Sequence, residues 1–539
     1  MKRFLLAVCI PPLLLGFLEL LATLLGVVPA PRFWLECTGE DGKPWLQANL
    51  RSPWGGLPFR PNAFPTAKDH RTYRIFCLGE STTNGFPFAR HSSFSQLLAV
   101  RLAQLHPYLK FEVVKMGYDA KSALAIAELC REVVRYDPDL IVLYMGHNEF
   151  LGQNLPDVRH PWSSRFRRVL SRFSLGRLLL SLAPAPEGAG HDLPKNPERR
   201  IDDHPFLSAA ELEQGYENFR EGLTAIFDYC REARVALLIC RPASNLKDYP
   251  PRRSHLSETL GAEERRQFRT LEADAQKLLD EGLYEDALPR LREAEAIDAT
   301  PALLHFRIGE CLRHLGDLEG ARGAYLQARD RDDHPNRATS RILRIINDAT
   351  RFFARMADVE KTFTLAAPDR LPGRDLFLDN CHPTLDAQNL IADAILHAMA
   401  RANLVAPEDE WLFDAEPDLA EYRRRMGLDL TRVATDFAAD AIVNMAQLLG
   451  VEGAVDPRRP AEEAFRFALQ YDASNPTAEL GLAIVATLRD DAGAAAGHLR
   501  VSQARDAAVF RRFLEFAKGK GLLQDVARRL SGAPAGGGQ

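Results

Sequence analysis

The sequence predicts an α/β fold in which a parallel sheet is interrupted by helical insertions. Short apolar runs typical of buried strands alternate with longer segments whose apolar residues recur at helical spacing. A separate segment repeats its small residues at the 34-residue period of a helical repeat. Because strands that are separated by helices pair in parallel, the alternating part predicts one sheet with helices on its faces.

The elements of this sheet are expected in a regular order along the chain. Buried strands are predicted at Tyr73–Leu78, Phe111–Met116, Ile141–Tyr144, Val235–Cys240 and Phe352–Met356. Amphipathic helices are predicted between them at Phe94–Leu105, Ser122–Tyr136 and Glu211–Ala233. Side chains that follow the carboxyl ends of parallel strands share one crevice, so motifs directly after these strands are expected to converge.

Between the last two predicted strands, small residues recur in pairs. The pairs are Gly282 and Gly316, Ala287 and Ala321, and Ala294 and Ala328. Small residues let antiparallel helices pack closely, and their spacing of 34 residues is the tetratricopeptide period. An ordinary helical hairpin is the alternative, but three coincidences at one period favour the repeat. Two repeats are too few to be stable alone, so we expect them to lean on the sheet domain.

The first residues predict the compartment. From Phe4 to Val28 the chain is almost wholly apolar, and as a helix it would extend about 37 Å, beyond the ~30 Å hydrocarbon core of a bilayer. Lys2 and Arg3 precede this stretch, which predicts a single-pass anchor with the rest of the chain on the non-cytoplasmic side, which in a bacterium is the periplasm. Glu19 weakens this prediction, because an ionised carboxylate in the middle of a bilayer costs ~2.5 kcal/mol or more. A cleaved signal peptide is the alternative, disfavoured because the stretch is long and lacks an A-x-A site.

Taken together, these features predict seven consecutive parts of the chain. They are a membrane anchor at 1–30, a linker at 31–72, the sheet domain at 73–262 with an insertion at 151–207, a tetratricopeptide-like helical insertion at 263–335, the rest of the sheet domain at 336–403, a C-terminal helical, tetratricopeptide-like domain at 404–530, and a disordered tail at 531–539.

Composition and charge narrow the function classes. With 539 residues, of which 46% are hydrophobic and 26% charged, the chain can bury a large core. The net charge of -5 leaves no basic excess of the kind that nucleic-acid binding needs, so no nucleic-acid partner is expected. The eight cysteines form no C-x-x-C pair, and therefore no zinc site or disulfide framework is predicted. One disulfide pair in an exported protein is left open, and the sequence does not identify its cysteines. No other metal or organic cofactor is expected.

The first chemical motif, from Gly79 to Thr82, follows the first predicted strand. A serine between a buried strand and a helix, as at Ser81, exposes its hydroxyl at the strand's end and points its backbone N–H into the same crevice. Alone this is a weak signal, because a serine at such a place is more often a helix N-cap. Thr83 also stands where a Gly-x-Ser-x-Gly elbow has its second glycine. Ser81 is the candidate nucleophile.

Candidate oxyanion donors follow the second and third predicted strands. Acyl transfer builds negative charge on the carbonyl oxygen, and each preorganised donor aimed at it contributes ~3 kcal/mol. Asn148 can supply its side-chain amide, and the loop from Gly117 to Ala120 can supply a backbone N–H. The plainer interpretation makes Asn148 a turn residue and Gly117 a tight bend.

An Asp–His pair opens the last predicted helix of the sheet domain. Between Asp379 and His382, a turn can aim the carboxylate at one imidazole nitrogen and leave the other nitrogen for Ser81. His382 would then be the general base. Alone, an Asp-x-x-His is usually an N-cap beside a surface histidine. In combination with Ser81 and Asn148, it predicts a hydrolytic site with nucleophile, base, orienting carboxylate and oxyanion donor.

In this order, the four motifs resemble the SGNH/GDSL hydrolase family, and the whole chain resembles its bacterial membrane-anchored members with tetratricopeptide repeats. The resemblance covers roughly residues 70–400. It implies a three-layer, flavodoxin-like fold and an esterase or O-acyl transferase without a cofactor. By position, Ser81 matches the family's nucleophile, Asn148 its oxyanion asparagine, His382 its base and Asp379 the residue that orients the base.

Two positions depart from the family's pattern. Glu80 stands where the family usually has Asp, a longer carboxylate beside the nucleophile. Alignment on Val113 and Val114 places Ala120, in place of Gly117, at the family's backbone oxyanion position. A backbone N–H survives that change, so Ala120 and Gly117 both remain candidate donors.

Two further segments are candidates for contacts outside the catalytic residues. The loop after the fourth strand holds Asn245 and Lys247, which are candidate substrate contacts, with a solvated loop as the alternative. Within the insertion, Trp162–Leu182 is a basic amphipathic helix by pattern. It is expected either to lie on an anionic membrane surface or to cover the active site as a lid whose apolar side packs on the domain.

The sequence therefore predicts a membrane-anchored serine hydrolase that acts on ester bonds of an acylated envelope substrate, a polysaccharide or a lipid. Water or a second hydroxyl accepts the acyl group, so hydrolysis and acyl transfer both remain open. The alternative is a non-catalytic SGNH-like scaffold whose tetratricopeptide helices recruit a protein partner in the envelope. The presence of all four side chains favours catalysis, whereas Glu80 and Ala120 leave room for the scaffold.

Overall fold

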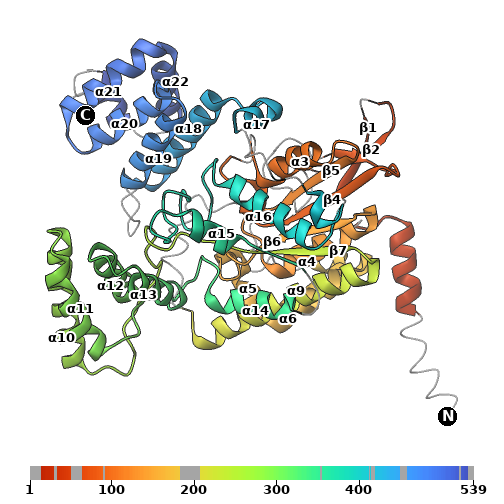
Figure 1. Ribbon diagram of the computed structural model, residues 1–539, viewed down its shortest axis with the longest axis horizontal. Coiled ribbons are helices and arrows are strands. Elements are labelled where there is room, and N and C mark those ends of the chain that lie inside the picture. Colours follow the sequence, from red (N-terminus) through yellow and green to blue (C-terminus); the bar gives the residue numbers. More distant parts are fainter. Residues whose placement is uncertain are drawn as a thin grey trace. The chain divides into compact units, whose positions relative to one another are not determined.

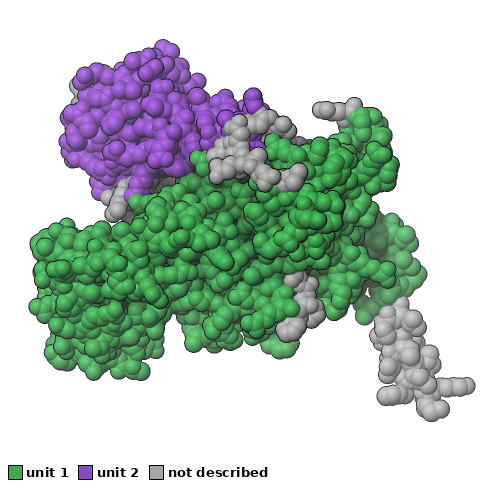
Figure 2. All heavy atoms as spheres, viewed as in Figure 1, with its two compact units in different colours: residues 1–190, 206–416 green, residues 191–205, 417–539 purple. Residues whose placement is uncertain are grey.

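The computed structural model divides the protein into two compact units (Figures 1 and 2). Unit 1 lies within residues 1–190 and 206–416, and unit 2 includes residues 417–539. The structure describes residues 14–28, 33–39, 41–49, 63–88, 92–182, 207–351, 355–411, 413, 419–449, 458–520 and 524–531. The predicted tail at 531–539 lies outside the described residues except for its first residue.

Unit 1 is built around a five-stranded parallel sheet with the order β5-β4-β6-β7-β8. Its strands are β4 (Thr72–Gly79), β5 (Lys110–Gly117), β6 (Leu140–Tyr144), β7 (Ala236–Arg241) and β8 (Arg355–Asp358). This confirms the predicted α/β class and its parallel sheet. The chain passes from β4 outward to β5 and then back across to β6, so the strand order reverses beside β4. In open α/β sheets, the crevice at such a reversal is where ligands bind.

Helices cover both faces of the sheet (Figure 1). Successive strand residues point to opposite faces, and Ile75 and Cys77 of β4 pack in a core with α3, α15 and α16, while Phe76 and Leu78 pack in a second core with α4, α9 and α14. These helices are α3 (Phe94–Leu105), α4 (Ala123–Val133), α9 (Ala209–Ala233), α14 (Ser340–Thr350), α15 (Val359–Ala366) and α16 (Gln388–Arg401). Because both faces are covered, every residue of β6 is buried, which explains its continuous apolar run.

The predicted linker at 31–72 contains a second, antiparallel sheet of three short strands. They are β1 (Trp34–Thr38), β2 (Pro44–Ala48) and β3 (Ala63–Pro65). Trp34 and Phe64 are buried and meet edge to face at 4.8 Å between ring centroids, and both contact Phe76 of β4. This stretch is therefore part of the core of unit 1, which its mixed composition did not reveal.

The predicted repeats form two consecutive helical hairpins. Their helices are α10 (Ala262–Asp280), α11 (Tyr284–Ile297), α12 (Ala302–His314) and α13 (Leu318–Asp330). Gly282 and Gly316 occupy the turns of the two hairpins with φ of 75° and 87°, a conformation that disfavours any side chain. Leu246 and Leu371 of the sheet domain are buried in the same cluster as the hairpin helices, so the hairpins do lean on the sheet domain.

The insertion at 151–207 is helical as far as it is described. It contains a 3-10 turn at Gly152–Asn154 and the helices α5 (Leu155–Arg159), α6 (Pro161–Ser171) and α7 (Ser174–Leu182). The apolar side chains of Phe166, Val169 and Phe173 are about half exposed or more. In contrast, Arg168 pairs with Asp157 and Arg172 with Glu128. The predicted lid, with its apolar side packed on the domain, is therefore not what the structure shows.

The predicted single-pass anchor is contradicted. Among the described residues, no helix is long and apolar enough to cross a membrane. The described helix of this region covers residues 14–24, which at 1.5 Å per residue reaches only about half of a ~30 Å hydrocarbon core, and residues 1–13 lie outside the described part. Glu19, which weakened the predicted span, accepts hydrogen bonds from the backbone N–H groups of Ser174 and Leu175, at the start of α7.

Unit 2 consists of helices throughout its described residues. They are α17 (Leu419–Met426), α18 (Leu430–Leu448), α19 (Arg458–Tyr471), α20 (Pro476–Leu488), α21 (Ala492–Arg505), α22 (Ala507–Lys520) and α23 (Gln524–Ser531). The most deeply buried helix is α20, which explains its almost wholly apolar sequence. The predicted boundary at residue 404 lies earlier than this unit, because Trp411 packs in the sheet core beside α3 and α16.

Candidate active site

Ser81 lies at the carboxyl end of β4, at the reversal of strand order. It is the first residue of the one-turn helix α2 (Ser81–Asn84), and Glu80 before it has extended backbone angles. Gly79 makes the tight approach possible, because a Cβ at this position would lie 2.0 Å from the carbonyl oxygen of Tyr144 on β6. The side chain of Ser81 therefore reaches the rim between β4 and β6 with 8% of the residue exposed.

The structure brings Ser81 together with both members of the predicted Asp–His pair. His382 Nε2 lies 2.7 Å from Ser81 Oγ, and His382 Nδ1 lies 2.6 Å from Asp379 Oδ2. The other carboxylate oxygen of Asp379 accepts the backbone N–H groups of Cys381 and His382 at 3.0 and 2.9 Å. With the proton on Nδ1, His382 donates to Asp379 and accepts from the Ser81 hydroxyl, as a general base requires.

The electrostatics of the pair favour an ionised carboxylate beside the imidazole. Burial by itself raises the pKa of Asp379, but the charge and hydrogen bonds of His382 outweigh it and lower the pKa below its ordinary value. Burial by itself lowers the pKa of His382, but the charge and hydrogen bond of Asp379 raise it overall. Each group therefore stabilises the charged form of the other.

Asn148 lies in the loop that follows β6, and its side chain is buried. The residue is 5% exposed, and among the described residues its buried Nδ2 has no hydrogen-bond partner. A buried amide without an acceptor is costly unless a ligand supplies one. Asn154, which the sequence analysis did not single out, holds this loop, since its Nδ2 donates to the carbonyl oxygens of Asn148 at 2.7 Å and Ala120 at 3.1 Å.

The two candidate backbone donors lie in different surroundings. Gly117 is the last residue of β5, where a Cβ would lie 2.0 Å from the backbone nitrogen of Asn84. The close approach of α2 therefore explains why residue 117 is a glycine. Ala120 lies in the following loop with φ of 58°, and no acceptor for its N–H is found within the described ranges. Both residues remain candidate donors, and Ala120 is the one whose N–H has no acceptor among the described residues.

The loop after β7 supports the Asp379 segment. Asn245 is 1% exposed, and its Nδ2 and backbone N–H donate to the carbonyl oxygens of Asp379 at 3.0 Å and Asn380 at 2.9 Å. Lys247 pairs with Asp375 at 3.3 Å. Both side chains are engaged by protein groups and brace these loops, and their contact with a substrate stays a prediction. No sequence signal separated these two uses.

A metal at this site would have to displace the hydrogen bonds just described. In the described part of the chain, one group of three residues has potential metal-ligand atoms within 4.8 Å of one another. It consists of Asp379, Cys381 and His382. However, both ring nitrogens of His382 are engaged by Asp379 and Ser81. Burial raises the pKa of the Cys381 thiol well above its ordinary value, which disfavours the thiolate that a metal needs. The donor set therefore fits proton transfer and does not fit metal coordination.

Glu80 is the buried residue directly before the candidate nucleophile Ser81. Its two carboxylate oxygens accept the backbone N–H groups of Gly146 at 3.0 Å and His147 at 3.1 Å, so it holds the loop that carries Asn148. Burial raises the pKa of Glu80 to about 7, against these hydrogen bonds, which lower it. The Glu80 side chain thus spans from the strand that carries Ser81 to the loop that carries Asn148.

Glu80 is expected to make stability depend on pH. Because its pKa is about 7 in the folded state and 4.5 ordinarily, the folded protein binds this proton more tightly between these values. The contribution of Glu80 to the free energy of unfolding is therefore full below about pH 4.5 and is lost as the pH rises through about 7. Urea unfolding across this range should show that the difference between wild type and Glu80→Gln shrinks as the pH rises. The exposed Glu263→Gln is the control, and a constant difference for Glu80→Gln would contradict the expectation.

Comparison with known proteins gives limited guidance. No family model and no curated protein matches the sequence. Among solved structures, an acetylxylan esterase from Geobacillus stearothermophilus aligns at 11% identity over 61% of this chain and 94% of its own, with a TM-score of 0.29. An alpha/beta hydrolase enzyme from the metagenome of Lake Arreo, Spain, aligns at 13% identity over 60% and 94%, also at 0.29. Scores this low carry no argument about this chain.

Proposed function

We propose that this protein is a serine hydrolase or acyl transferase of the SGNH type that acts on ester bonds. The observation that carries the proposal is the continuous contact from Asp379 through both ring nitrogens of His382 to Ser81 Oγ. Ser81 and His382 are 301 residues apart, so no local preference accounts for their 2.7 Å contact. It occurs at the edge of the sheet where α/β proteins bind their ligands.

In the proposed mechanism, Ser81 Oγ attacks the acyl carbonyl while His382 accepts its proton at Nε2. Asp379 stabilises the imidazolium that forms. The oxyanion is held by Asn148 Nδ2 and by the backbone N–H groups of Ser81 and Ala120. Collapse of the tetrahedral intermediate transfers the proton from His382 to the leaving alcohol and leaves the acyl group on Ser81. Water or a second hydroxyl, deprotonated by His382, then removes the acyl group.

The proposed substrate is an acylated polysaccharide or lipid, and no metal or organic cofactor takes part. Phe86 is the observation that supports an apolar acyl group in the substrate. Its ring lies 4.7 Å from the His382 ring, and the residue is 38% exposed, so an apolar group bound beside Ser81 could contact it. If the second acceptor is a sugar hydroxyl, the same residues perform acyl transfer, since the acyl enzyme is common to both reactions.

A fluorophosphonate probe tests the proposed nucleophile directly. The activated Ser81 hydroxyl should displace the leaving group at phosphorus, and mass spectrometry should place the adduct on the peptide that contains Ser81. Ser81→Ala should take no label, whereas Ser163→Ala, a surface serine of α6, should be labelled as wild type. A wild-type protein that stays unlabelled at Ser81 would argue against catalysis and for the scaffold function.

Asn148→Ala is expected to lower kcat by about 10²–10³-fold, because one oxyanion donor contributes roughly 3 kcal/mol in the transition state. KM should change little, since the ground-state carbonyl oxygen carries less charge. Steady-state kinetics on a short-chain nitrophenyl ester measure both constants. Asn389→Ala, which changes a partly exposed asparagine of α16, is the control. A higher KM with kcat unchanged would instead show that Asn148 contributes to substrate binding and not to the oxyanion site.

We also propose that helices α10–α13 are two tetratricopeptide repeats that bind a protein partner. The support is that Gly282 and Gly316, one repeat period apart, take equivalent left-handed turns in the two hairpins. Such a partner is compatible with catalysis at Ser81. Binding of a protein partner would be the main function only if Ser81 takes no label in the fluorophosphonate experiment.

A further inference from the structure

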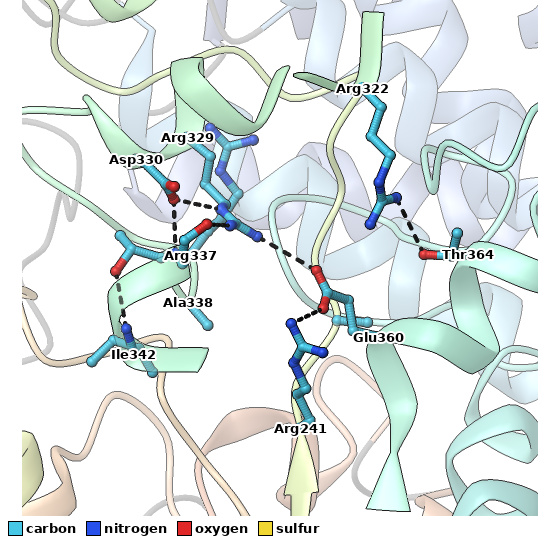
Figure 3. A network of polar contacts seen from close by, with 12 residues as sticks. Arg241, Arg322, Arg329, Asp330, Arg337, Ala338, Ile342, Glu360 and Thr364 are labelled. Atoms are coloured by element: carbon cyan, nitrogen blue, oxygen red, sulfur yellow. Dashed lines mark hydrogen bonds and ion pairs between the residues drawn. The ribbon is translucent and has the colours of Figure 1, made fainter. Parts of the chain in front are cut away.

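A cavity of about 460 Å³ lies where the helical hairpins meet the carboxyl ends of β7 and β8. Its walls come from α13, α14, the end of β7, and the start of α15. Basic side chains line much of the cavity, namely Arg241, Arg322, Arg329, Arg344 and Lys361. Ser340 and Thr364 add hydroxyl groups. Figure 3 shows Arg241 extending from the end of β7 and Arg329 approaching from the hairpin side, with Glu360 between them. None of these residues belongs to the Ser81 site.

The charges that line this cavity are unbalanced. Five of its side chains are cationic, and only Asp358 and Glu360 are carboxylates. Asp330 does not line the cavity, but its carboxylate pairs with Arg329 at 3.0 Å and so offsets one of the five positive charges. Even with Asp330 included, the cations exceed the carboxylates by two. Arg329 is 2% exposed, so part of this excess is held away from water.

The protein's own groups leave much of the donor capacity unused. Glu360 is shared, at 2.7 Å from Arg241 and 3.9 Å from Arg329. Among the described residues, the one hydrogen bond of the Arg322 side chain is a long contact of 3.5 Å with the hydroxyl of Thr364. Arg241 also has a buried Nε without a hydrogen-bond partner among the described residues.

Two more cations complete the lining. In the described ranges, neither Arg344 nor Lys361 has an ion pair with a carboxylate. A guanidinium presents several N–H donors in a planar fork that matches the oxygens of a phosphate, and charge-assisted bonds of this kind are the strong ones. A monovalent carboxylate would leave at least one positive charge uncompensated, whereas a doubly charged phosphate balances the excess of two.

We propose that this cavity binds the phosphate group of a ligand, with Arg322, Arg329 and Arg344 as the principal donors. The hydroxyls of Ser340 and Thr364 complete the set as neutral donors. The site is separate from the proposed esterase chemistry, and it stands whether or not Ser81 is catalytic.

A ligand here would act on a segment that also supports the catalytic loop. Arg329 Nη2 donates to Ser340 Oγ at 2.8 Å, which ties the cavity wall to the start of α14. A few residues earlier, Arg337 Nη1 donates at 2.9 Å to the carbonyl oxygen of Asn245, the residue that braces Asp379. Phosphate at the cavity would therefore hold in place the same segment that the Asp379 loop rests on.

Calorimetric titration of the full chain with inorganic phosphate, at constant ionic strength, tests the proposal. Wild type should show saturable binding that chloride does not reproduce. The double variant Arg322→Gln/Arg344→Gln should bind phosphate at least about tenfold more weakly, since each lost charge-assisted hydrogen bond accounts for a tenfold or greater change. Arg290→Gln, a surface arginine of α11 paired with Glu293, should bind as wild type.

Three outcomes would overturn the proposal. They are absence of saturable phosphate binding to wild type, equal phosphate binding by the double variant, and tighter binding of acetate or succinate than of phosphate. If thermal unfolding shows that the double variant does not fold, Lys361→Gln takes its place, because Lys361 is exposed and its removal disturbs no ion pair found in the described residues. A several-fold weaker affinity for phosphate is then the expected result, and an unchanged affinity would again refute the site.

Discussion

Ser81→Ala is expected to reduce kcat for ester hydrolysis by about 10⁴-fold or more, to the level that the oxyanion donors alone sustain. The reason is that alanine removes the attacking oxygen, while Asn148 and the backbone donors still polarise a bound carbonyl. The measurement is initial-rate kinetics on a nitrophenyl ester, with enzyme concentrations high enough to follow the residual rate.

The structure indicates that this loss will be chemical and not a failure to fold. Within the described part of the chain, Ser81 Oγ hydrogen-bonds to His382 and to no other group. The backbone of α2 is capped independently of the hydroxyl, because Gly85 N–H bonds to the carbonyl oxygen of Ser81. Thermal unfolding of the variant should therefore stay close to that of wild type. Activity in Ser81→Ala comparable to that of Ser163→Ala would rule out Ser81 as the nucleophile.

Asp379→Asn is expected to cost a similar factor, about 10⁴ in kcat, for a different reason. An asparagine keeps one oxygen as acceptor for the backbone N–H groups of Cys381 and His382, and so turns its amide nitrogen toward His382 Nδ1. His382 Nδ1 must then accept a hydrogen bond from this amide, which places the ring proton of His382 on Nε2. His382 would donate to Ser81 where it has to accept, and the base would be lost.

The same variant should move the pH dependence of the residual activity. His382 acts as a base only when neutral, so kcat/KM rises with pH through the pKa of His382. Asp379 raises that pKa above its ordinary value of 6.5 in wild type. Without the carboxylate, the midpoint should fall to lower pH. Glu263→Gln, which removes an exposed carboxylate of α10, is the control, and a midpoint that is equal in Asp379→Asn and wild type would refute the coupling.

The sheet could be predicted from the sequence because its pattern is local. The four apolar runs that predict the first four strands correspond to β4, β5, β6 and β7, and each prediction falls within two residues of the observed ends. The last strand was expected slightly early, since β8 is observed at Arg355–Asp358 and residues 352–354 lie outside the described part. The identity of the candidate site residues was also readable, because strand-edge motifs carry it.

Features that depend on contacts between distant segments were not readable. The strands at Trp34–Thr38 and Pro44–Ala48 have too little periodicity to be recognised, and they form because Trp34 packs on Phe64 and Phe76. The apolar start of the chain predicted a membrane span, whereas the helix described there is short. Hydropathy alone does not show where a helix ends or which backbone groups Glu19 contacts.

The sequence by itself determined the parallel α/β class and the chemical character of Ser81, Asn148, Asp379 and His382, because apolar periodicity and residue type are properties of neighbouring positions. Only the tertiary structure decided that Ser81 and His382 lie 2.7 Å apart, that Asn245 braces Asp379, and that five cations surround one cavity. Those distances depend on strand order and on how hairpins and loops pack across hundreds of residues. Such packing is a sum of many long-range contacts, and no local pattern encodes it.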